Sequence, residues 1–525
     1  MFQKLRELSK NLAIYGLGDV AVTGINFLLL PVYMVYLTPE DYGVLALLGS
    51  VEVIAKIVFR WGLDGSFMRF YYDAERPEDR QALASTIFFF LLGVSGALLV
   101  AGLVASPWIV SQLEGSPSSV RALQLVLLNT FAIGFTFLPF HVLRMEQQSK
   151  TFSALTLARS ISTLLLRIAL VVWAGMGVMG VVLTDIAVTA AILVVLLRYF
   201  APLIRPVFSR AVLRDSLHFG LPRLPHAFAQ QVMSVGDRFI LTKFRSVAEI
   251  GIYSIGVSFG LTIKLFLSAF EYAWAPFYYA TAREPGAPRI FAGVTTYGFA
   301  VLCLLTAGLS AIASDVLALM ARPDYAQASG VIAWTAVGVL LQGIYLLTSV
   351  GLNITKNTRY YPVATMTAAA ANVGLNYLLI PRYGIIGAAW ANGAAYGVQA
   401  VMAFRFSQRF YPVPYEWGRL ARVSAAALIA YGVARALPAM PPAAGFLVRG
   451  TSVVVVFGAL LGLTGFLRRD ELQVLNRFRR RGAAVPRVQP AETVELAGDI
   501  VAADVPAESI PEATGDGTIT VYPHK

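Results

Sequence analysis

The chain is poor in cysteine and histidine, the side chains that most often build disulfide frameworks and zinc sites. Its one cysteine, Cys303, has no internal disulfide partner and falls inside an apolar run, where it is most simply a packing residue. The four histidines, His141, His218, His226 and His524, have no metal-ligand spacing. The sequence therefore predicts neither a disulfide-stapled domain nor a histidine-based metal site.

Charged residues are also scarce. They make up 14% of the 525 residues, whereas 57% are hydrophobic, and the mean hydropathy is +0.66. A soluble protein of this length needs far more polar surface, so the composition predicts an integral membrane protein. The apolar runs are too long for β-barrel strands and lack their two-residue alternation. No cleavable signal peptide is expected, because the first run is too long and lacks a small-residue cleavage site.

The long apolar runs predict an all-α membrane protein. A helix needs roughly 20 apolar residues to cross a bilayer, which gives about 14 transmembrane helices here. The predicted spans cover residues 10–36, 42–66, 84–106, 120–143, 152–173, 177–197, 216–241, 250–273, 290–313, 327–351, 361–380, 384–404, 422–436 and 450–467.

The net charge of +12 is distributed unevenly along the chain. If the N-terminus lies in the cytoplasm, about two thirds of the lysines and arginines fall in loops and ends on that side, as the positive-inside rule describes. This pattern predicts cytoplasmic N- and C-termini. It also makes anionic lipid headgroups, rather than nucleic acid, the expected contact of the basic excess.

The sequence resembles itself at an offset of about 204–208 residues, a spacing typical of internal repeats in transporters. The Glu-x-Gly-like turns Glu40–Gly43 and Glu249–Gly251 are one such pair, and Gly177–Gly180 and Gly384–Gly387 are another. We therefore expect two parallel six-helix lobes and two added helices, with substrate bound between the lobes. The predicted parts are an N-terminal lobe at 1–200, a C-terminal lobe at 201–415, helices 13 and 14 at 416–470, and a basic juxtamembrane segment with a disordered cytoplasmic tail at 471–525.

Four charges at steps of four residues interrupt the second span: Glu52, Lys56, Arg60 and Asp64. On a continuous helix they form one slanting stripe about 18 Å long. One interpretation is two structural ion pairs, Glu52–Lys56 and Arg60–Asp64. The other is a hydrated lumen that crosses much of the membrane, since isolated charges are costly in lipid.

Other charges within the predicted spans favour the lumen. The remaining cations are Arg159, Arg167, Arg223, Arg238 and Lys264, and the remaining acids are Asp19, Asp185, Asp237 and Glu271. Arg60, Arg159, Arg223 and Lys264 fall in the cytoplasmic half or near the middle, which suits a phosphate or pyrophosphate loaded from the cytoplasm. The acids nearly cancel the cations, which weakens the case for an anionic ligand.

Asp237 and Arg238 lie nearer the outer end of the seventh span. Adjacent helical residues point about 100° apart, so the two side chains need not pair. A gate or a contact between lobes is as good an interpretation as a ligand contact. Pro222 and Pro225 are expected to break the start of this helix beside Arg223.

Motifs of several enzyme classes are absent from the sequence. It contains no Gly-x-x-x-x-Gly-Lys-Ser/Thr loop, no His-Glu-x-x-His and no Gly-x-Ser-x-Gly. The chain is therefore predicted to be a transporter without ATPase or transferase activity.

Eight segments resemble motifs of the polysaccharide-biosynthesis flippases, a family of the multidrug/oligosaccharidyl-lipid/polysaccharide exporter superfamily. They keep the family's order and spacing within about residues 5–470. The segments are Tyr15–Gly18, Asn26–Tyr33, Leu37–Gly43, Gly62–Phe70, Phe219–Arg223, Asp237–Leu241, Gly251–Tyr253 and Asn376–Ala389.

The resemblance implies a fourteen-helix, V-shaped, two-lobed flippase in the bacterial inner membrane. Its substrate would be undecaprenyl-pyrophosphate-linked oligosaccharide, moved from the cytoplasmic to the periplasmic leaflet, with a polysaccharide polymerase and chain-length machinery as partners. The implied substrate-binding residues are Lys56, Arg60, Asp64, Arg223 and Lys264, with Arg69 in the second-helix motif.

No cofactor is implied. Coupling stays open between protons, sodium and membrane potential, and the candidate coupling or gating residues are Asp19, Glu52, Asp237, Arg238 and Glu271.

Three other functions compete with this interpretation. A drug/cation antiporter of the same superfamily should have an acid-dominated cavity, whereas cations here at least match acids. A polysaccharide polymerase or ligase should have a long outer loop with clustered arginine and histidine, which this chain lacks. A membrane scaffold has no need of charges at membrane depth.

Overall fold

The structure, a computed structural model, describes residues 24–25, 27–113 and 117–466. This part of the chain consists of helices joined by short turns and loops and contains no β-strand, which confirms the all-α prediction. Ten of its helices are long and apolar enough to cross a membrane. The number fourteen stays a prediction, because most of the first predicted span, with Asp19, lies outside the described residues. The predicted division into lobes and tail also stays a prediction.

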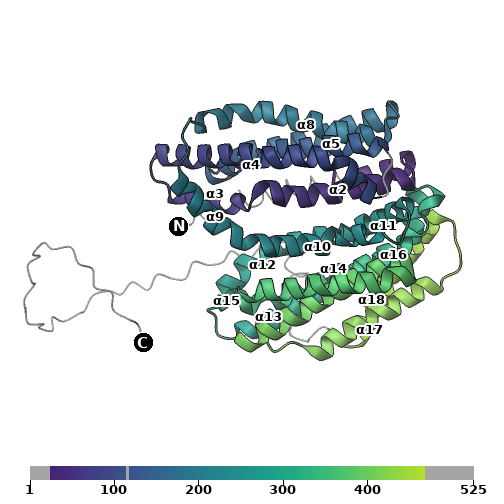
Figure 1. The fold of residues 1–525 in the computed structure, drawn as a ribbon. Coiled ribbons are helices and arrows are strands. Elements are labelled where there is room, and N and C mark those ends of the chain that lie inside the picture. The colour runs from purple at the N-terminus through teal and green to yellow at the C-terminus, as the bar shows by residue number, and fades with distance from the viewer. Residues whose placement is uncertain (1–23, 26, 114–116, 467–525) are drawn as a thin grey trace, which may run out of the picture. The chain divides into compact units, whose positions relative to one another are not determined.

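The helices of the first half of the chain are α2 (Pro39–Arg60), α3 (Leu63–Asp73), α4 (Pro77–Gln112), α5 (Pro117–Ile133), α6 (Phe137–Met145), α7 (Ser149–Arg167) and α8 (Gly177–Phe200). A short apolar helix, Phe27–Tyr36, precedes them. In Figure 1, α4, α5 and α8 run side by side, and α4 and α8 both pack on α5.

The second half contains α9 (Arg210–Gly220), α10 (Leu224–Leu241), α11 (Val247–Gly260), α12 (Lys264–Thr281), α13 (Ala287–Met320), α14 (Ala328–Thr348), α15 (Val350–Ile354) and α16 (Tyr360–Phe410). Two further helices, α17 (Trp417–Ala436) and α18 (Pro442–Leu463), follow and pack on α13 (Figure 1). The predicted spans 361–380 and 384–404 both lie in α16, which is kinked at Gly384.

The second predicted span, 42–66, is not one straight helix, and this part of the prediction is wrong. Helix α2 ends at Arg60, Trp61 and Gly62 take left-handed backbone angles, and α3 begins at Leu63. The break lets Gly62 and Gly220 meet: a Cβ on either glycine would lie 2.7 Å from the other's carbonyl oxygen. Asp64 therefore belongs to a different helix from Glu52, Lys56 and Arg60.

The seventh span is interrupted where its prolines predict. Helix α9 ends at Gly220, a 3-10 turn covers Leu221–Arg223, and α10 begins at Leu224. Proline lacks a backbone N–H and cannot continue the hydrogen-bond ladder, so Pro222 and Pro225 explain the interruption.

The two halves touch where α2 crosses α11. A Cβ on Gly43 would collide with the carbonyl oxygen of Val247, and a Cβ on Gly251 would collide with that of Pro39. The contact is reciprocal, because Gly43 and Pro39 stand 208 residues before Gly251 and Val247. Only glycine lets two helix backbones approach this closely.

Capping boxes of the same kind begin both crossing helices. The Thr38 hydroxyl accepts from the Asp41 N–H at 3.1 Å in α2, and the Ser246 hydroxyl accepts from the Glu249 N–H at 3.3 Å in α11. Each carboxylate in turn accepts from the backbone N–H of its cap residue. The caps are also 208 residues apart, so the repeat visible in the sequence has the same local structure in both copies.

A buried ion pair that the sequence analysis missed joins α18 to α13. Arg449 Nη1 lies 2.6 Å from Asp315 Oδ1, and the two side chains are 12% and 7% exposed. The prediction ended the ninth span at 313 and began the fourteenth at 450, so both residues were placed just outside the membrane. The helices in fact extend to Met320 and back to Pro442.

We expect Gly43→Ala to destabilise the protein by about 1–3 kcal/mol, because the added methyl meets backbone rather than a movable side chain. Chemical unfolding in mixed micelles measures the change. Gly93→Ala in α4 is the matched control, since its Cβ would meet open space. Equal stability of the two variants would contradict the steric role of Gly43.

We expect Arg449→Leu to cost about 3–5 kcal/mol of stability, because it leaves the Asp315 carboxylate buried without its partner. The double variant Asp315→Leu/Arg449→Leu should regain most of that loss in the same unfolding measurement. A double variant as unstable as the single one would show that the packing of α18, rather than charge pairing, sets the cost.

Candidate functional site

A polar cavity of about 320 Å³ lies between the two halves, beside α2. Residues from α2 and α8 line one wall, and residues from α10 and α11 line the other. Its polar lining consists of Tyr33, Tyr42, Ser50, Glu52, Arg167, Asp185, Arg238, Ser254 and Ser258. Four of these nine side chains are charged, so the cavity suits a polar or charged ligand rather than a lipid chain.

Arg167 is held rigidly on the first wall. Its Nη1 donates to the Tyr33 hydroxyl at 2.7 Å, and its Nη2 donates to Asp185 Oδ1 at 2.6 Å. The Arg167 side chain is 17% exposed and that of Asp185 is 33% exposed. The guanidinium therefore presents a fixed positive charge at the cavity, with one carboxylate beside it.

Arg238 is fixed in a similar way on the second wall. Its Nε donates to the Ser254 hydroxyl at 3.1 Å, and its Nη1 donates to the Ser234 carbonyl at 3.0 Å. The expectation that Asp237 and Arg238 need not pair is corrected here: Arg238 Nη1 lies 3.6 Å from Asp237 Oδ1, because the guanidinium folds back toward its own helix.

Asp237 does not line the cavity and instead contacts Arg238 from the buried side of α10. It is 1% exposed and accepts hydrogen bonds from the Tyr253 hydroxyl and, at 3.4 Å, from Asn392 Nδ2. The backbone N–H of Arg238 also donates to it at 2.8 Å. These bonds tie α10 to α11 and α16, so the second wall is one connected network.

The charges of the interrupted second span form the two expected ion pairs. Lys56 Nζ lies 2.6 Å from Glu52 Oε1, and Arg60 Nη1 lies 3.3 Å from Asp64 Oδ2 across the helix break. The four charges are therefore paired, and one of them, Glu52, also lines the polar cavity. The substrate-binding role of these residues stays a prediction.

Aromatic rings and arginines pack where α3 meets α9, at the far end of α2 from the glycine crossing. The guanidinium of Arg223 lies 4.2 Å from the centre of the Phe219 ring, and that of Arg69 lies 5.6 Å from it. Phe70 packs edge-on against Phe219 at 5.9 Å. Together with the Gly62–Gly220 contact, these rings pack the two halves against each other at this end of α2.

The sequence-predicted binding residues are not gathered in one place. Arg60, Arg223 and Lys264 are not among the residues that line the cavity. Arg60 lies 5.7 Å from the Phe137 ring, and Lys264 Nζ lies 6.0 Å from that of Tyr396. Glu271 lies on the exposed side of α12.

Four cavity residues have no role predicted from the sequence, namely Tyr33, Tyr42, Ser254 and Ser258. Tyr42 and Ser258 contact each other across the α2–α11 crossing, with 3.5 Å between their hydroxyl oxygens. The four-residue spacing of Ser254 and Ser258 on an apolar helix was the available signal. It indicates a polar stripe, although serine in membrane helices often bonds only its own backbone.

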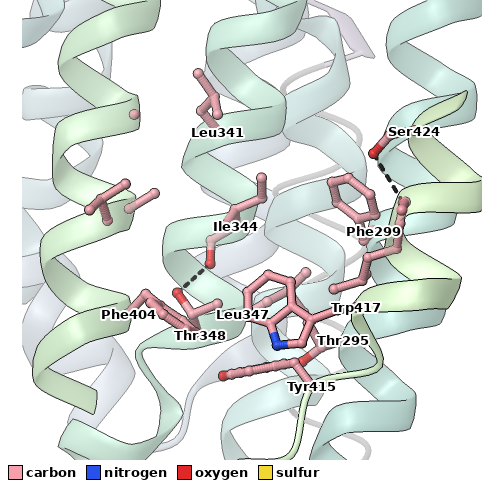
Figure 2. Close-up of a pocket in the computed structure, with 15 residues that line it drawn as sticks. Thr295, Phe299, Leu341, Ile344, Leu347, Thr348, Phe404, Tyr415, Trp417 and Ser424 are labelled. Carbon is pink, nitrogen blue, oxygen red and sulfur yellow. Dashed lines mark hydrogen bonds between the residues drawn. The ribbon is translucent and has the colours of Figure 1, made fainter. Parts of the chain in front are cut away.

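A second cavity, of about 540 Å³, has a different chemistry. Figure 2 shows it between α13, α14, α16 and α17, lined by side chains such as Phe299, Leu341 and Phe404. Two of its hydroxyls donate within their own helices: Thr348 to the Ile344 carbonyl at 2.7 Å and Ser424 to the Leu420 carbonyl at 3.0 Å. No charged side chain lines it, so it does not suit a phosphate.

No cluster of three or more histidine, cysteine, aspartate or glutamate side chains occurs within residues 24–25, 27–113 and 117–466. This part of the chain therefore offers no multi-ligand site for a divalent metal.

A family model described as polysaccharide biosynthesis protein matches residues 36–276. Among solved structures, the lipid II flippase MurJ in an inward closed conformation has a TM-score of 0.63 at 15% identity. The alignment covers 89% of this chain and 99% of that one.

A multidrug resistance MATE family transporter of the MOP superfamily, in an inward-facing conformation, has a TM-score of 0.62 at 15% identity, with 77% and 96% covered. A MOP superfamily transporter from Pyrococcus furiosus has a TM-score of 0.51 at 14% identity, with 79% and 96% covered. These likenesses show a shared fold. No curated protein matches the sequence.

We expect Tyr33→Phe to destabilise the protein by about 1.5–3 kcal/mol, because it removes the hydroxyl that accepts from the Arg167 guanidinium. Tyr36→Phe is the matched control, since Tyr36 lies on the same short helix and is 52% exposed. Unfolding in mixed micelles compares the two. A Tyr33→Phe variant as stable as the control would mean that Asp185 alone positions Arg167.

Proposed function

We propose that the chain is a lipid-linked oligosaccharide flippase, and the match of a polysaccharide biosynthesis protein family model to residues 36–276 supports this proposal. Its substrate is undecaprenyl-pyrophosphate-linked oligosaccharide, which it moves from the cytoplasmic to the periplasmic leaflet for cell-surface polysaccharide such as O-antigen, capsule or exopolysaccharide. The membrane is the bacterial inner membrane, with both termini in the cytoplasm, and the polysaccharide polymerase and chain-length machinery are partners.

One observation carries the proposal: the charged cavity lies between the two halves of a repeat fold, and each half supplies a fixed arginine to it. Arg167 comes from the first half and Arg238 from the second. A ligand held by both arginines binds both halves, so its binding can be linked to their relative motion.

In the proposed cycle, the pyrophosphate enters from the cytoplasm and pairs with Arg60, Arg223 and Lys264. Lys56 and Asp64 belong to the same entry path. Arginines and lysines replace the water around the phosphates, which lowers the cost of crossing the hydrocarbon layer. Motion of the halves then exposes the head group on the other side while the isoprenoid tail stays in lipid.

The cavity arginines extend this set. Arg167 and Arg238 hold the phosphates after Arg60 and Arg223, because they lie deeper along α2 toward the glycine crossing. Bidentate guanidinium contacts suit phosphate oxygens. Glu52, Asp19 and Glu271 are the proposed coupling acids and Asp237 with Arg238 the proposed gate, driven by a proton gradient, a sodium gradient or the membrane potential, without a cofactor.

A drug/cation antiporter is the second candidate. The fold likeness to a MATE family transporter favours it as much as the likeness to MurJ favours a flippase. Glu52 and Asp185 in the cavity could bind an organic cation. The arginine from each half opposes it, since a bound cation would face two fixed positive charges.

A leaflet-exposure assay in proteoliposomes tests the proposal. The probe is the undecaprenyl-pyrophosphate-linked oligosaccharide fraction extracted from host cells that lack this protein, labelled on its sugars. Wild type should expose the label on the opposite leaflet over time. Arg238→Gln and Arg60→Gln should slow this about tenfold or more, because each removes a charge-assisted contact to phosphate.

Arg121→Gln is the matched control, since Arg121 is an exposed arginine of α5. It should transport like wild type. Wild-type vesicles that leave the lipid in its original leaflet but expel a cationic dye would replace the flippase with the antiporter. Full activity of both Arg60→Gln and Arg238→Gln would refute their assigned roles.

A further inference from the structure

Helix α12 has an unusual composition for a membrane helix. Seven of its 18 residues are aromatic, namely Phe266, Phe270, Tyr272, Trp274, Phe277, Tyr278 and Tyr279. The helix continues α11 after a 3-10 turn at Leu261–Ile263, and the two together form one candidate span, Val247–Thr281. Its aromatic residues do not all face the same way, and their distribution divides the helix into three faces.

One face is packed into the protein. Phe270, Trp274 and Tyr278 follow each other at steps of four residues, with ring centres 5.5 Å and 5.7 Å apart. Trp274 also contacts Phe291 of α13 at 5.9 Å and is 3% exposed. These rings anchor α12 to the second half of the chain, and their role is structural.

A second face is polar and aromatic. At 100° per residue, the side chains of Lys264, Ser268, Glu271, Tyr272 and Tyr279 lie within an arc of about 100°. Tyr272 is 54% exposed and Tyr279 is 55% exposed, and Ser268 and Glu271 are exposed as well. Ala275 lies in the middle of this arc, so a small side chain separates two exposed tyrosines from a carboxylate.

The third face is apolar. It carries Leu265, Ala269, Pro276 and Ala280, of which all but Leu265 are exposed. Phe277 lies at the boundary with the packed face, and its ring stacks on Trp274 at 5.7 Å. Lipid chains accept these side chains without cost, whereas a carboxylate in contact with hydrocarbon costs about 2.5–3.5 kcal/mol. The apolar face therefore suits lipid, and the polar arc suits a hydrated space.

We propose that the polar arc of α12, formed by Glu271, Tyr272 and Tyr279 around Ala275, binds the sugar rings of the transported lipid. The proposal rests on the flippase function given above and assigns the glycan its own surface. A sugar ring has an apolar C–H face that stacks on tyrosine and a rim of hydroxyls that donate to a carboxylate. Aromatic side chains with a few convergent polar groups are typical of such sites.

The position of the arc relative to Lys264 supports this assignment. Lys264, the proposed phosphate contact, begins the arc, and Tyr279 ends it fifteen residues later, about 22 Å along the helix. A pyrophosphate at Lys264 therefore leaves the attached sugars alongside Ser268, Glu271 and the two tyrosines. The order of groups along α12 matches the order of groups in the lipid-linked glycan.

Binding of two probes to purified protein in nanodiscs tests the proposal. One probe is bare undecaprenyl pyrophosphate, and the other is the extracted undecaprenyl-pyrophosphate-linked oligosaccharide. Tyr272→Ala and Tyr279→Ala should each weaken binding of the glycan-bearing lipid about tenfold and leave binding of the bare lipid unchanged. Tyr272→Phe should retain most of the affinity, because stacking needs the ring rather than the hydroxyl.

Phe277→Ala is the control, because Phe277 is also an exposed aromatic residue of α12, 40% exposed, but lies outside the polar arc, with its ring stacked on Trp274 at 5.7 Å. It should bind both probes like wild type. Equal weakening of both probes by Tyr272→Ala, or weakening by Phe277→Ala alone, would overturn the glycan site and make these rings membrane-interface anchors. Wild-type protein that binds neither probe would instead overturn the flippase function, and the glycan site with it.

Discussion

The packing of the two halves depends on one steric condition: α2 and α11 must cross with no side chain between their backbones. Gly43 and Gly251 meet this condition reciprocally, each lying against a carbonyl of the other helix. Side-chain contacts then follow from the backbone approach, as in the Tyr42–Ser258 pair and in Tyr325, whose hydroxyl donates to the Leu37 carbonyl at 3.2 Å. Because the contact repeats at 208 residues, the crossing is nearly symmetric, with a glycine of each helix against a carbonyl of the other.

The position of the cavity follows from this crossing. Gly43 and Gly62 are 19 residues apart, about 28 Å along a helix, and each packs against backbone of the second half. The cavity lies between these two contacts, and Glu52, near their midpoint along the chain, lines it.

The sequence predicts those features well that depend on the residues of a single helix. Long apolar runs predict the helices, the prolines predict the interruption before Leu224, and the Glu-x-Gly turns predict the repeat. It predicts poorly those features that depend on contacts between two different helices. At the break formed by Trp61 and Gly62, the backbone of Gly62 lies against that of Gly220 from the second half. The pair Arg449–Asp315 joins two helices across 134 residues of chain, and the pair Arg167–Asp185 joins the neighbouring helices α7 and α8 across 18 residues. No local pattern records such partners, so the charges could be found but not their pairing.

The balance of charges, which on the sequence weakened the case for an anionic ligand, has a physical explanation in the cavity. Each cavity arginine has its own carboxylate, Asp185 for Arg167 and Asp237 for Arg238. These partly buried cations are neutralised when no anion is bound, because an unpaired buried charge is strongly destabilising. The pyrophosphate of the proposed substrate would have to compete with these carboxylates. It carries two or more charges spread over several oxygens, whereas each carboxylate pairs with one arginine. The acids thus lower the affinity for any single anionic group and leave the advantage with ligands that span both halves.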